Sequence, residues 1–128
     1  MITPLSAPGY IFCMPYLSIR TNSSLNEEQQ SELLDAASKV VASELRKPEE
    51  YVMVSFLHAP RMRFAGDESP TACLELSSIG VPDSQRNPLV SALTDLVART
   101  CKIEAARIFV VLADVQARFW GLNGATIG

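Results

Sequence analysis

Residues 72–113, ACLELSSIGVPDSQRNPLVSALTDLVARTCKIEAARIFVVLA, decide the fold. The opening ACLELSS alternates apolar and polar side chains, which predicts a strand that ends near Gly80. The closing RIFVVLA, residues 107–113, is strongly apolar and rich in β-branched side chains, which predicts a second strand. The segment between them has the length and apolar spacing of a helix, so this stretch predicts a strand–helix–strand unit.

The predicted helix of this unit is bounded by clear signals. Pro82 and Asp83 open it, and it ends near Cys101. Pro88 is expected in the first turn, where a missing backbone N–H costs little. The apolar side chains that recur at helical spacing are Leu89, Leu93, Leu96 and Val97.

A similar unit precedes it. The segment PYLSIRT, residues 15–21, alternates and predicts the first strand. Ser24 and Glu27 have the spacing of a capping box and predict the start of a helix, which Pro48 ends. YVMVSFL, residues 51–57, predicts the next strand, with apolar groups on both faces. The apolar stripe of this helix comprises Leu33, Leu34, Ala37, Val40, Val41 and Leu45.

The order strand, helix, strand therefore occurs twice, which indicates an internal duplication. The two joints before the second and fourth strands also look alike, with Lys47 and Glu49 in one and Lys102 and Glu104 in the other. We predict an α/β (α+β) fold in which two β-α-β repeats form a four-stranded mixed sheet with two helices on one face. The other face would expose apolar strands, so we expect a homo-oligomer that covers it.

The composition narrows the class of protein. The chain has 128 residues, a mass of 14.0 kDa and 48% hydrophobic residues, enough for a single domain with a core. Its net charge of −3 and pI near 5.1 show no basic excess, so neither nucleic acid nor a membrane surface is an expected partner.

The cysteines do not form a metal or disulfide pattern. Cys13, Cys73 and Cys101 are odd in number and scattered, and His58 is the one histidine. We therefore expect no zinc site and no disulfide framework. No apolar stretch approaches the roughly 20 residues of a membrane span, and the first residues lack the pattern of a signal peptide. The expected location is the cytoplasm, or outside the cell by a route without a signal peptide.

Both ends of the chain differ from the two units. Residues 1–14 contain Pro4, Pro8 and Gly9, carry no charged side chain and show no apolar periodicity typical of a helix or strand. They are interpreted as an N-terminal extension to a domain that spans residues 15–128. The tail, residues 119–128, is short and rich in glycine, which predicts an edge strand or a docking arm.

Four segments resemble the macrophage migration inhibitory factor family in order and spacing, and the resemblance covers residues 15–128. They are MPYLSIRTN at 14–22, RKPEEYVMV at 46–54, SSIG at 77–80 and WGLNGATIG at 120–128. The resemblance implies a homotrimer with an active site at each subunit interface. It also implies cofactor-free keto-enol tautomerisation of a small keto or enol acid, with phenylpyruvate-like 2-keto acids as the expected substrates.

The resemblance assigns roles to particular residues. A proline at the position of Pro15 is the N-terminal residue of the family and works as general base and then general acid. A lysine at the position of Lys47 binds the substrate carboxylate, and the backbone N–H at the position of Ile79 contacts the substrate. The other matching positions that would line the pocket are Tyr16, Tyr51, Ser77, Trp120 and Ile127.

Two substitutions change the wall that a neighbouring subunit would offer. The mammalian cytokine has tyrosine and asparagine where this chain has Phe109 and Val111. Polar contacts are lost, so an aromatic keto acid is expected to suit the site better than a polar one.

The residues before Pro15 decide whether this chemistry exists. With Met14 attached, the Pro15 nitrogen is a tertiary amide with no useful basicity. Two explanations compete: either translation starts at Met14, or the extension is retained and the protein does something else. The alternatives to an enzyme are a non-catalytic binding or signalling module and a structural relic whose pocket survives only because it packs well. Without the resemblance, Pro15 is simply a strand-start residue and Lys47 a cation at a helix C-terminus.

Overall fold

The computed structural model describes residues 14–128, so most of the predicted extension, residues 1–13, lies outside the described part. Two strand–helix–strand units follow one another, as predicted. The main elements are β1 (Tyr16–Thr21), α2 (Glu27–Leu45), β2 (Met53–His58), β3 (Ala72–Ile79), α3 (Asp83–Cys101) and β4 (Ile108–Val115). Within residues 14–128, no helix is both long and apolar enough to cross a bilayer.

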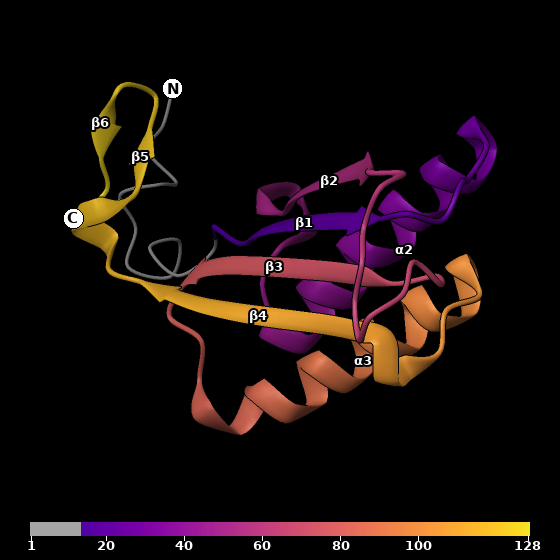
Figure 1. Cartoon of the computed structure of the whole chain (residues 1–128). Helices are drawn as coiled ribbons and strands as arrows, with labels where there is room; N and C mark the ends of the chain where they lie inside the picture. The colour runs from indigo at the N-terminus through magenta and orange to yellow at the C-terminus, as the bar shows by residue number, and fades with distance from the viewer. Residues whose placement is uncertain (1–13) are drawn as a thin grey trace.

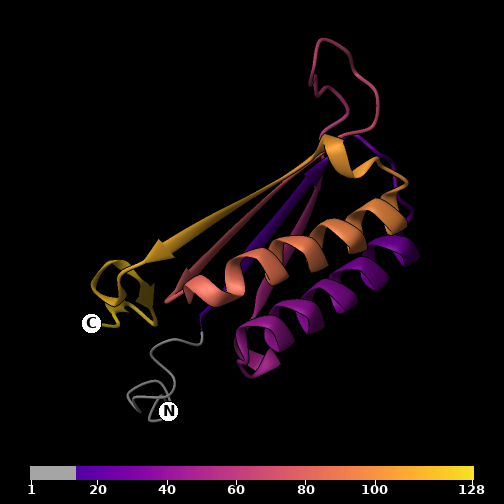
Figure 2. The same cartoon turned by 90° about the horizontal axis from the view of Figure 1, so that it is seen from below.

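The four strands form one mixed sheet in the order β2-β1-β3-β4 (Figure 1). Each unit contributes a parallel pair, β1 with β2 and β3 with β4, and the two units join through the antiparallel pair β1 and β3. Both helices pack side by side on the same face of the sheet (Figure 2). The predicted fold is therefore confirmed.

The core lies between the sheet and the two helices. Leu17 and Ile19 of β1 are fully buried beside Leu74 and Leu76 of β3, because these alternate side chains face the helices. The predicted helix stripes are also found here, although Leu34 and Val40 are only half-buried. The buried stripe residues are Leu33, Ala37, Val41, Leu45, Leu89, Leu93, Leu96 and Val97.

The two units repeat with a constant offset. Helices α2 and α3 have identical lengths and begin and end 56 residues apart, and both stop at a left-handed residue, Arg46 with φ 56° and Lys102 with φ 57°. Lys47 and Ile103 then donate backbone hydrogen bonds to Ala42 and Ala98. Such endings satisfy helix carbonyls that would otherwise lack partners. In this repeat Lys102 corresponds to Arg46 and Ile103 to Lys47, so the lysines of the two similar joints do not occupy equivalent positions.

Helix α2 begins two residues later than the predicted capping box. Its N-cap is Asn26, whose side chain accepts a hydrogen bond from the backbone N–H of Gln29, and the Gln29 side chain accepts one from Asn26 N in return. The prediction that Ser24 and Glu27 form this box was wrong. Both pairs have a suitable spacing, and an asparagine caps at least as well as a serine.

Replacing Asn26 should therefore weaken the start of α2. We expect Asn26→Ala to lower the free energy of unfolding by about 1 kcal/mol, because it leaves a backbone N–H without its side-chain acceptor. Ser24→Ala is the matched control and should change it by less than about 0.5 kcal/mol. Urea unfolding of both variants measures the difference, and a larger loss from Ser24→Ala would contradict the cap assignment.

Pro88 does not lie in the first turn of α3, as had been predicted. The helix begins at Asp83 after Pro82, so Pro88 is its sixth residue and lies inside the helix. Proline has no N–H and removes one bond of the helical ladder there. The adjoining Leu89 is fully buried against the sheet, and this packing holds the helix across the missing bond.

Strand boundaries shift where short turns intervene. Residues Glu49–Tyr51 form the 3-10 turn η2, so β2 begins at Met53 rather than at residue 51. The corresponding turn η3 (Ala105–Arg107) delays β4 to Ile108. The tail forms the turn η4 (Ala117–Phe119) and a small hairpin, β5 (Gly121–Leu122) with β6 (Ala125–Thr126). This hairpin projects beyond the end of the main sheet (Figure 1).

The face of the sheet without helices is not uniformly apolar. Its two edge strands expose apolar side chains, but its two central strands carry polar ones, because β1 and β3 alternate strictly. The exposed apolar side chains on the edges are Met53, Leu57, Phe109 and Val111. The central positions are Tyr16, Ser18, Arg20, Cys73, Glu75 and Ser77.

Candidate functional site

A hollow of about 430 Å³ lies at the end of the sheet where β1 begins. Four of the predicted site residues, Pro15, Tyr16, Tyr51 and Trp120, line it together. These residues come from three separate parts of the chain, the start of β1, the turn η2 and the tail, and the fold brings them together. The remaining lining residues are Met14, Glu50, Val52, Met53, Gly121 and Leu122.

Pro15 is held firmly at the base of this hollow. Its side chain is fully buried, and its carbonyl accepts a hydrogen bond from the backbone N–H of Met53 at 3.0 Å. This bond extends the ladder between β1 and β2 by one residue. The next residue, Tyr16, shares a 2.9 Å hydrogen bond between its hydroxyl and that of Ser55 on β2. The start of β1 is therefore a rigid base for the hollow.

Turns position the aromatic walls. Tyr51 ends η2, where its backbone N–H donates to the carbonyl of Pro48 at 3.1 Å. Trp120 follows η4, and its carbonyl accepts the N–H of Ile127 at 2.8 Å. Ile127 therefore closes the tail hairpin beside Trp120, although it does not line the hollow itself.

Lys47 lines a second hollow of about 370 Å³ together with Gly80 and Asp114, and with Val81 and Pro82. The Gly80 N–H donates to Asp114 Oδ1 at 3.0 Å, and Gly80 has a φ of 79°, a left-handed conformation that glycine adopts without strain. This bond ties the end of β3, where Ile79 is only 2% exposed, to β4.

Ser77 and Val111 lie on the open face of the sheet. They line a third hollow of about 370 Å³ with Tyr16, Ser18, Arg20, Glu75, Leu76 and Ala113. Tyr16 is the residue that this hollow shares with the one beside Pro15. Ser77 and Val111 therefore do not line the hollow beside Pro15, and Tyr16 is the residue that lies between the two hollows.

Phe109 lies far from Pro15 within the same chain. It pairs with Cys73 on β3, whereas Ser77 opposes Tyr16, so four residues of strand separate the two positions. At about 3.3 Å per residue this is a distance of about 13 Å. A single chain therefore does not bring Phe109 to the hollow beside Pro15.

Phe109 packs instead against the loop between β2 and β3. Its ring meets that of Phe64 edge-on, with the ring centroids 4.9 Å apart. The Arg107 guanidinium lies 5.3 Å from the centroid of the Phe64 ring, in the range of a cation–π contact. The loop therefore supports the outer end of β4.

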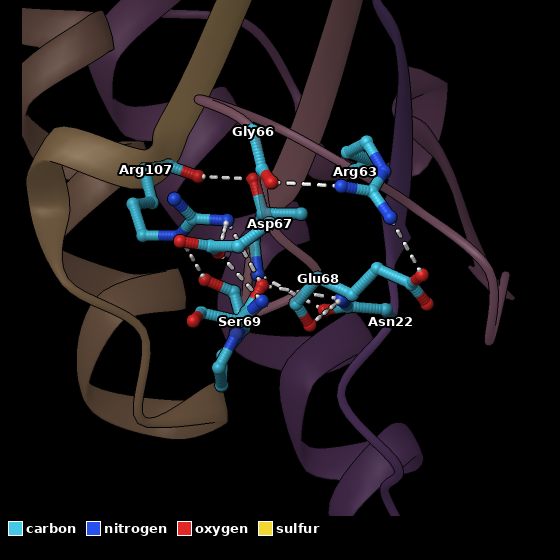
Figure 3. Close-up of polar contacts among 9 residues, drawn as sticks. Asn22, Arg63, Gly66, Asp67, Glu68, Ser69 and Arg107 are labelled. Atoms are coloured by element: carbon cyan, nitrogen blue, oxygen red, sulfur yellow. Dashed lines mark hydrogen bonds and ion pairs between the residues drawn. The ribbon is translucent and has the colours of Figure 1, made fainter.

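Polar contacts hold this loop in place (Figure 3). The Asn22 side chain donates to the carbonyls of Glu68 and Ser69, each at 3.2 Å. Arg107 donates to the Ser69 carbonyl at 3.1 Å and forms an ion pair with Asp67 at 3.2 Å. The Ser69 backbone N–H donates to Asp67 and lowers the pKa of that carboxyl, and Arg107 lowers it further.

The two described cysteines do not favour thiolate chemistry. Burial raises the pKa of the Cys73 thiol, and Glu75 raises it further while Arg20 opposes the change. Burial also raises the pKa of the Cys101 thiol. Within residues 14–128, no group of three histidine, cysteine, aspartate or glutamate side chains could hold a metal ion. Cys13 lies outside the described residues.

Sequence reasoning missed several residues of this region. Met14 is only 6% exposed and lines the hollow beside Pro15, and Glu50 and Leu122 line it as well. Asp114 and Ser78 were also missed, because their positions follow from the pairing of β3 with β4. To find these residues one must know which positions of neighbouring strands lie opposite each other. The alternation of apolar and polar side chains does not determine this register.

Known proteins resemble this chain over nearly all of the described part. The profile of the macrophage migration inhibitory factor (MIF) family matches residues 14–128. A macrophage migration inhibitory factor homolog of Brugia malayi is 38% identical over 116 residues, which is 90% of this chain and all of that protein. Macrophage migration inhibitory factor of Xenopus laevis is 30% identical, over 88% of this chain and 98% of that protein.

Solved structures agree in fold. The macrophage migration inhibitory factor homologue from Prochlorococcus marinus has a TM-score of 0.82 and 32% identity, covering 88% of this chain and 99% of that one. Macrophage migration inhibitory factor of Toxoplasma gondii has a TM-score of 0.82 and 29% identity, covering 87% of this chain and 98% of that one. This chain therefore belongs to the macrophage migration inhibitory factor family.

Proposed function

We propose that this chain is a cofactor-free keto-enol tautomerase for phenylpyruvate-like 2-keto acids, with the amine of Pro15 as its acid and base. The observation that carries the proposal is the position of Pro15. It is fully buried at the base of a hollow whose other walls include Tyr51 and Trp120. A flat aromatic acid suits such a partly apolar cavity.

The reaction needs one group that accepts and returns a proton. Pro15 as the first residue has a secondary amine, and α-amino groups have pKa values of about 7.7 to 8.0 in model peptides. Burial disfavours the charged form and lowers that pKa, so a neutral amine is available near pH 7. The nitrogen removes a proton from the carbon beside the keto group, and the resulting enolate oxygen takes the proton back. No electron leaves the substrate.

Lys47 is proposed to hold the substrate carboxylate. It follows the end of α2 and lines the hollow that includes Gly80, directly after Ile79, whose backbone N–H is the proposed second contact. Lys47 does not line the hollow beside Pro15, and its ammonium group is proposed to approach the amine and favour the neutral form of Pro15.

A homotrimer would complete the site. Phe109 and Val111 are about half exposed on the outer strand of a single chain, and neither lines the hollow beside Pro15. Their apolar side chains are proposed to close the hollow of a neighbouring subunit, which would also remove them from water. The location is proposed to be the cytoplasm.

The test is turnover of phenylpyruvate by protein that begins at Pro15, followed through the ultraviolet absorbance of the enol. We expect Pro15→Gly to lower kcat/KM at least about 100-fold, because the proton-transfer group is altered. Pro60→Gly, in the exposed loop after β2, is the matched control and should keep the parent rate. Full activity of Pro15→Gly would remove Pro15 from the mechanism.

A further inference from the structure

Ser78 has a buried hydroxyl group that no hydrogen bond satisfies. The residue is completely buried, and among residues 14–128 its Oγ is the one buried side-chain oxygen or nitrogen atom without a partner. A buried hydroxyl without a hydrogen bond destabilises the folded state. Native proteins rarely leave such an atom unpaired, so its surroundings need an explanation.

Strand register places Ser78 across from Pro15. Tyr16 opposes Ser77 in the antiparallel pair of β1 and β3, and continuing this register by one residue brings Pro15 opposite Ser78. Both side chains are fully buried on the side of the sheet that faces the helices. Directly opposed residues have Cβ atoms roughly 4.5 to 5.5 Å apart, a separation that the side chain of one can bridge to reach the other.

The neighbour on the other side of Ser78 is Asp114 of β4. The Asp114 carboxylate accepts a hydrogen bond from the Gly80 backbone N–H at 3.0 Å, and Ser78 makes no bond to it. The row across three strands is therefore Pro15, Ser78 and Asp114, with the unpaired hydroxyl in the middle.

We propose that the Ser78 hydroxyl is the hydrogen-bond acceptor for the free amine of Pro15, an inference that rests on the proposed function in taking Pro15 as the first residue. With Met14 attached, the Pro15 nitrogen carries no hydrogen, so Ser78 has nothing to accept. As a first residue, the nitrogen carries one hydrogen when neutral and two when protonated. The Ser78 hydroxyl then accepts a hydrogen bond from the Pro15 nitrogen. In the neutral amine this bond also fixes the direction of the nitrogen lone pair, which accepts the substrate proton.

This bond should affect the proton affinity of Pro15. Hydrogen bonds to a charged donor are stronger than those to a neutral one, so Ser78 favours the protonated amine and raises its pKa. The negative charges of Asp114 on β4 and Glu50 on η2 also raise the Pro15 pKa. The positive charge of Lys47 after α2 lowers it, and burial lowers it too. Tyr51 on η2 also faces the hollow but carries no charge near pH 7.

The decisive measurement is the pKa of Pro15 itself, in protein that begins at this residue and carries isotope-labelled proline. Nuclear magnetic resonance follows the ring signals against pH and needs no turnover. We expect Ser78→Ala to lower the Pro15 pKa by roughly 0.5 to 1 unit. Ser18→Ala, on the open face of β1, is the matched control and should leave it unchanged.

The outcomes separate the two proposals. If the parent shows no tautomerase activity but Ser78→Ala lowers the Pro15 pKa, the proposed function fails and the hydrogen bond stands. If the parent is active and Ser78→Ala leaves the Pro15 pKa unchanged, the hydrogen bond is refuted and the proposed function stands. Ser78→Thr keeps the hydroxyl and should keep the parent pKa.

Thermal unfolding gives a second, independent test with two chain lengths. The buried core lies within residues 14–128, which span the whole of the Brugia malayi homolog, so the shorter chain is expected to fold. In the 128-residue chain, Ser78→Ala should leave Tm unchanged or raise it, because it removes an unpaired hydroxyl. In the chain that begins at Pro15, it should lower Tm. Equal shifts of Tm in both chains would contradict the inference.

Discussion

Protein that begins at Pro15 is expected to turn over phenylpyruvate about 1,000 times faster than the 128-residue chain. General acid–base catalysis contributes about 100- to 10,000-fold in enzymes, and the longer chain lacks the group that supplies it. In that chain the Pro15 nitrogen belongs to a peptide bond, whose resonance withdraws its lone pair. Intact mass of each preparation must confirm the first residue.

The rate of the shorter chain should also fall as the pH is lowered. A protonated amine has no lone pair to accept a proton, so kcat/KM declines as the pH passes below the pKa of Pro15. The pH at the midpoint of this decline reports the pKa of Pro15 in the free protein. The 128-residue chain has no such amine and should show no such profile.

A variant of the 128-residue chain distinguishes two causes of inactivity, an unreactive amide nitrogen at Pro15 and a hollow blocked by Met14. Met14 is buried and lines the hollow, so its side chain also occupies space beside Pro15. Met14→Gly in the 128-residue chain clears this space but keeps the amide, and it should remain inactive. If Met14→Gly restored the rate of the shorter chain, obstruction would be the cause and Pro15 would not be the base.

The sequence was sufficient for the fold because the fold depends on periodic features. The alternation in ACLELSS placed Leu74 and Leu76 on the helix face, and the spacing of Leu89, Leu93 and Val97 defined the buried side of α3. Each of these patterns extends over several residues, so one exception does not change the outcome. A cap depends on one or two side chains, and the structure uses Asn26 where Ser24 was predicted.

The candidate site was only partly predictable for a related reason. Pro15, Tyr51 and Trp120 were assigned by resemblance, and they do line one hollow. The neighbours that matter across strands follow from register, which alternation does not fix. Ser78 illustrates this point, since a serine in a strand reveals nothing about the residue it opposes. Phe109 could not be placed at the site from one chain, because it is proposed to line the hollow of a neighbouring subunit.

Val111→Lys is expected to convert the proposed homotrimer to a monomer and to lower the proposed tautomerase activity about 100-fold. Val111 is 49% exposed in the single chain and opposes Glu75 on β3, so a lysine there gains an opposite charge across the strands. The isolated chain should therefore keep its fold. In an interface the same ammonium group would be buried against apolar side chains, which is costly.

The loss of activity would follow from the loss of the neighbour. Without a second copy, the hollow beside Pro15 lacks the proposed wall from Phe109 and Val111, and water enters beside the amine. Light scattering should give a parent mass three times that of one chain and a variant mass equal to one chain. Ala106→Lys adds the same charge at an exposed site on η3 and should leave both mass and activity unchanged.

Two results would contradict this account in different ways. A parent that is monomeric and fully active would show that one chain forms a complete site, and Phe109 would then be an ordinary surface residue. If the parent is a trimer and the Val111→Lys variant is monomeric yet fully active, the proposed trimer stands but is not needed for catalysis. The apolar edges of the sheet would in that case serve association alone, and the hollow lined by Pro15, Tyr51 and Trp120 would be sufficient for the chemistry.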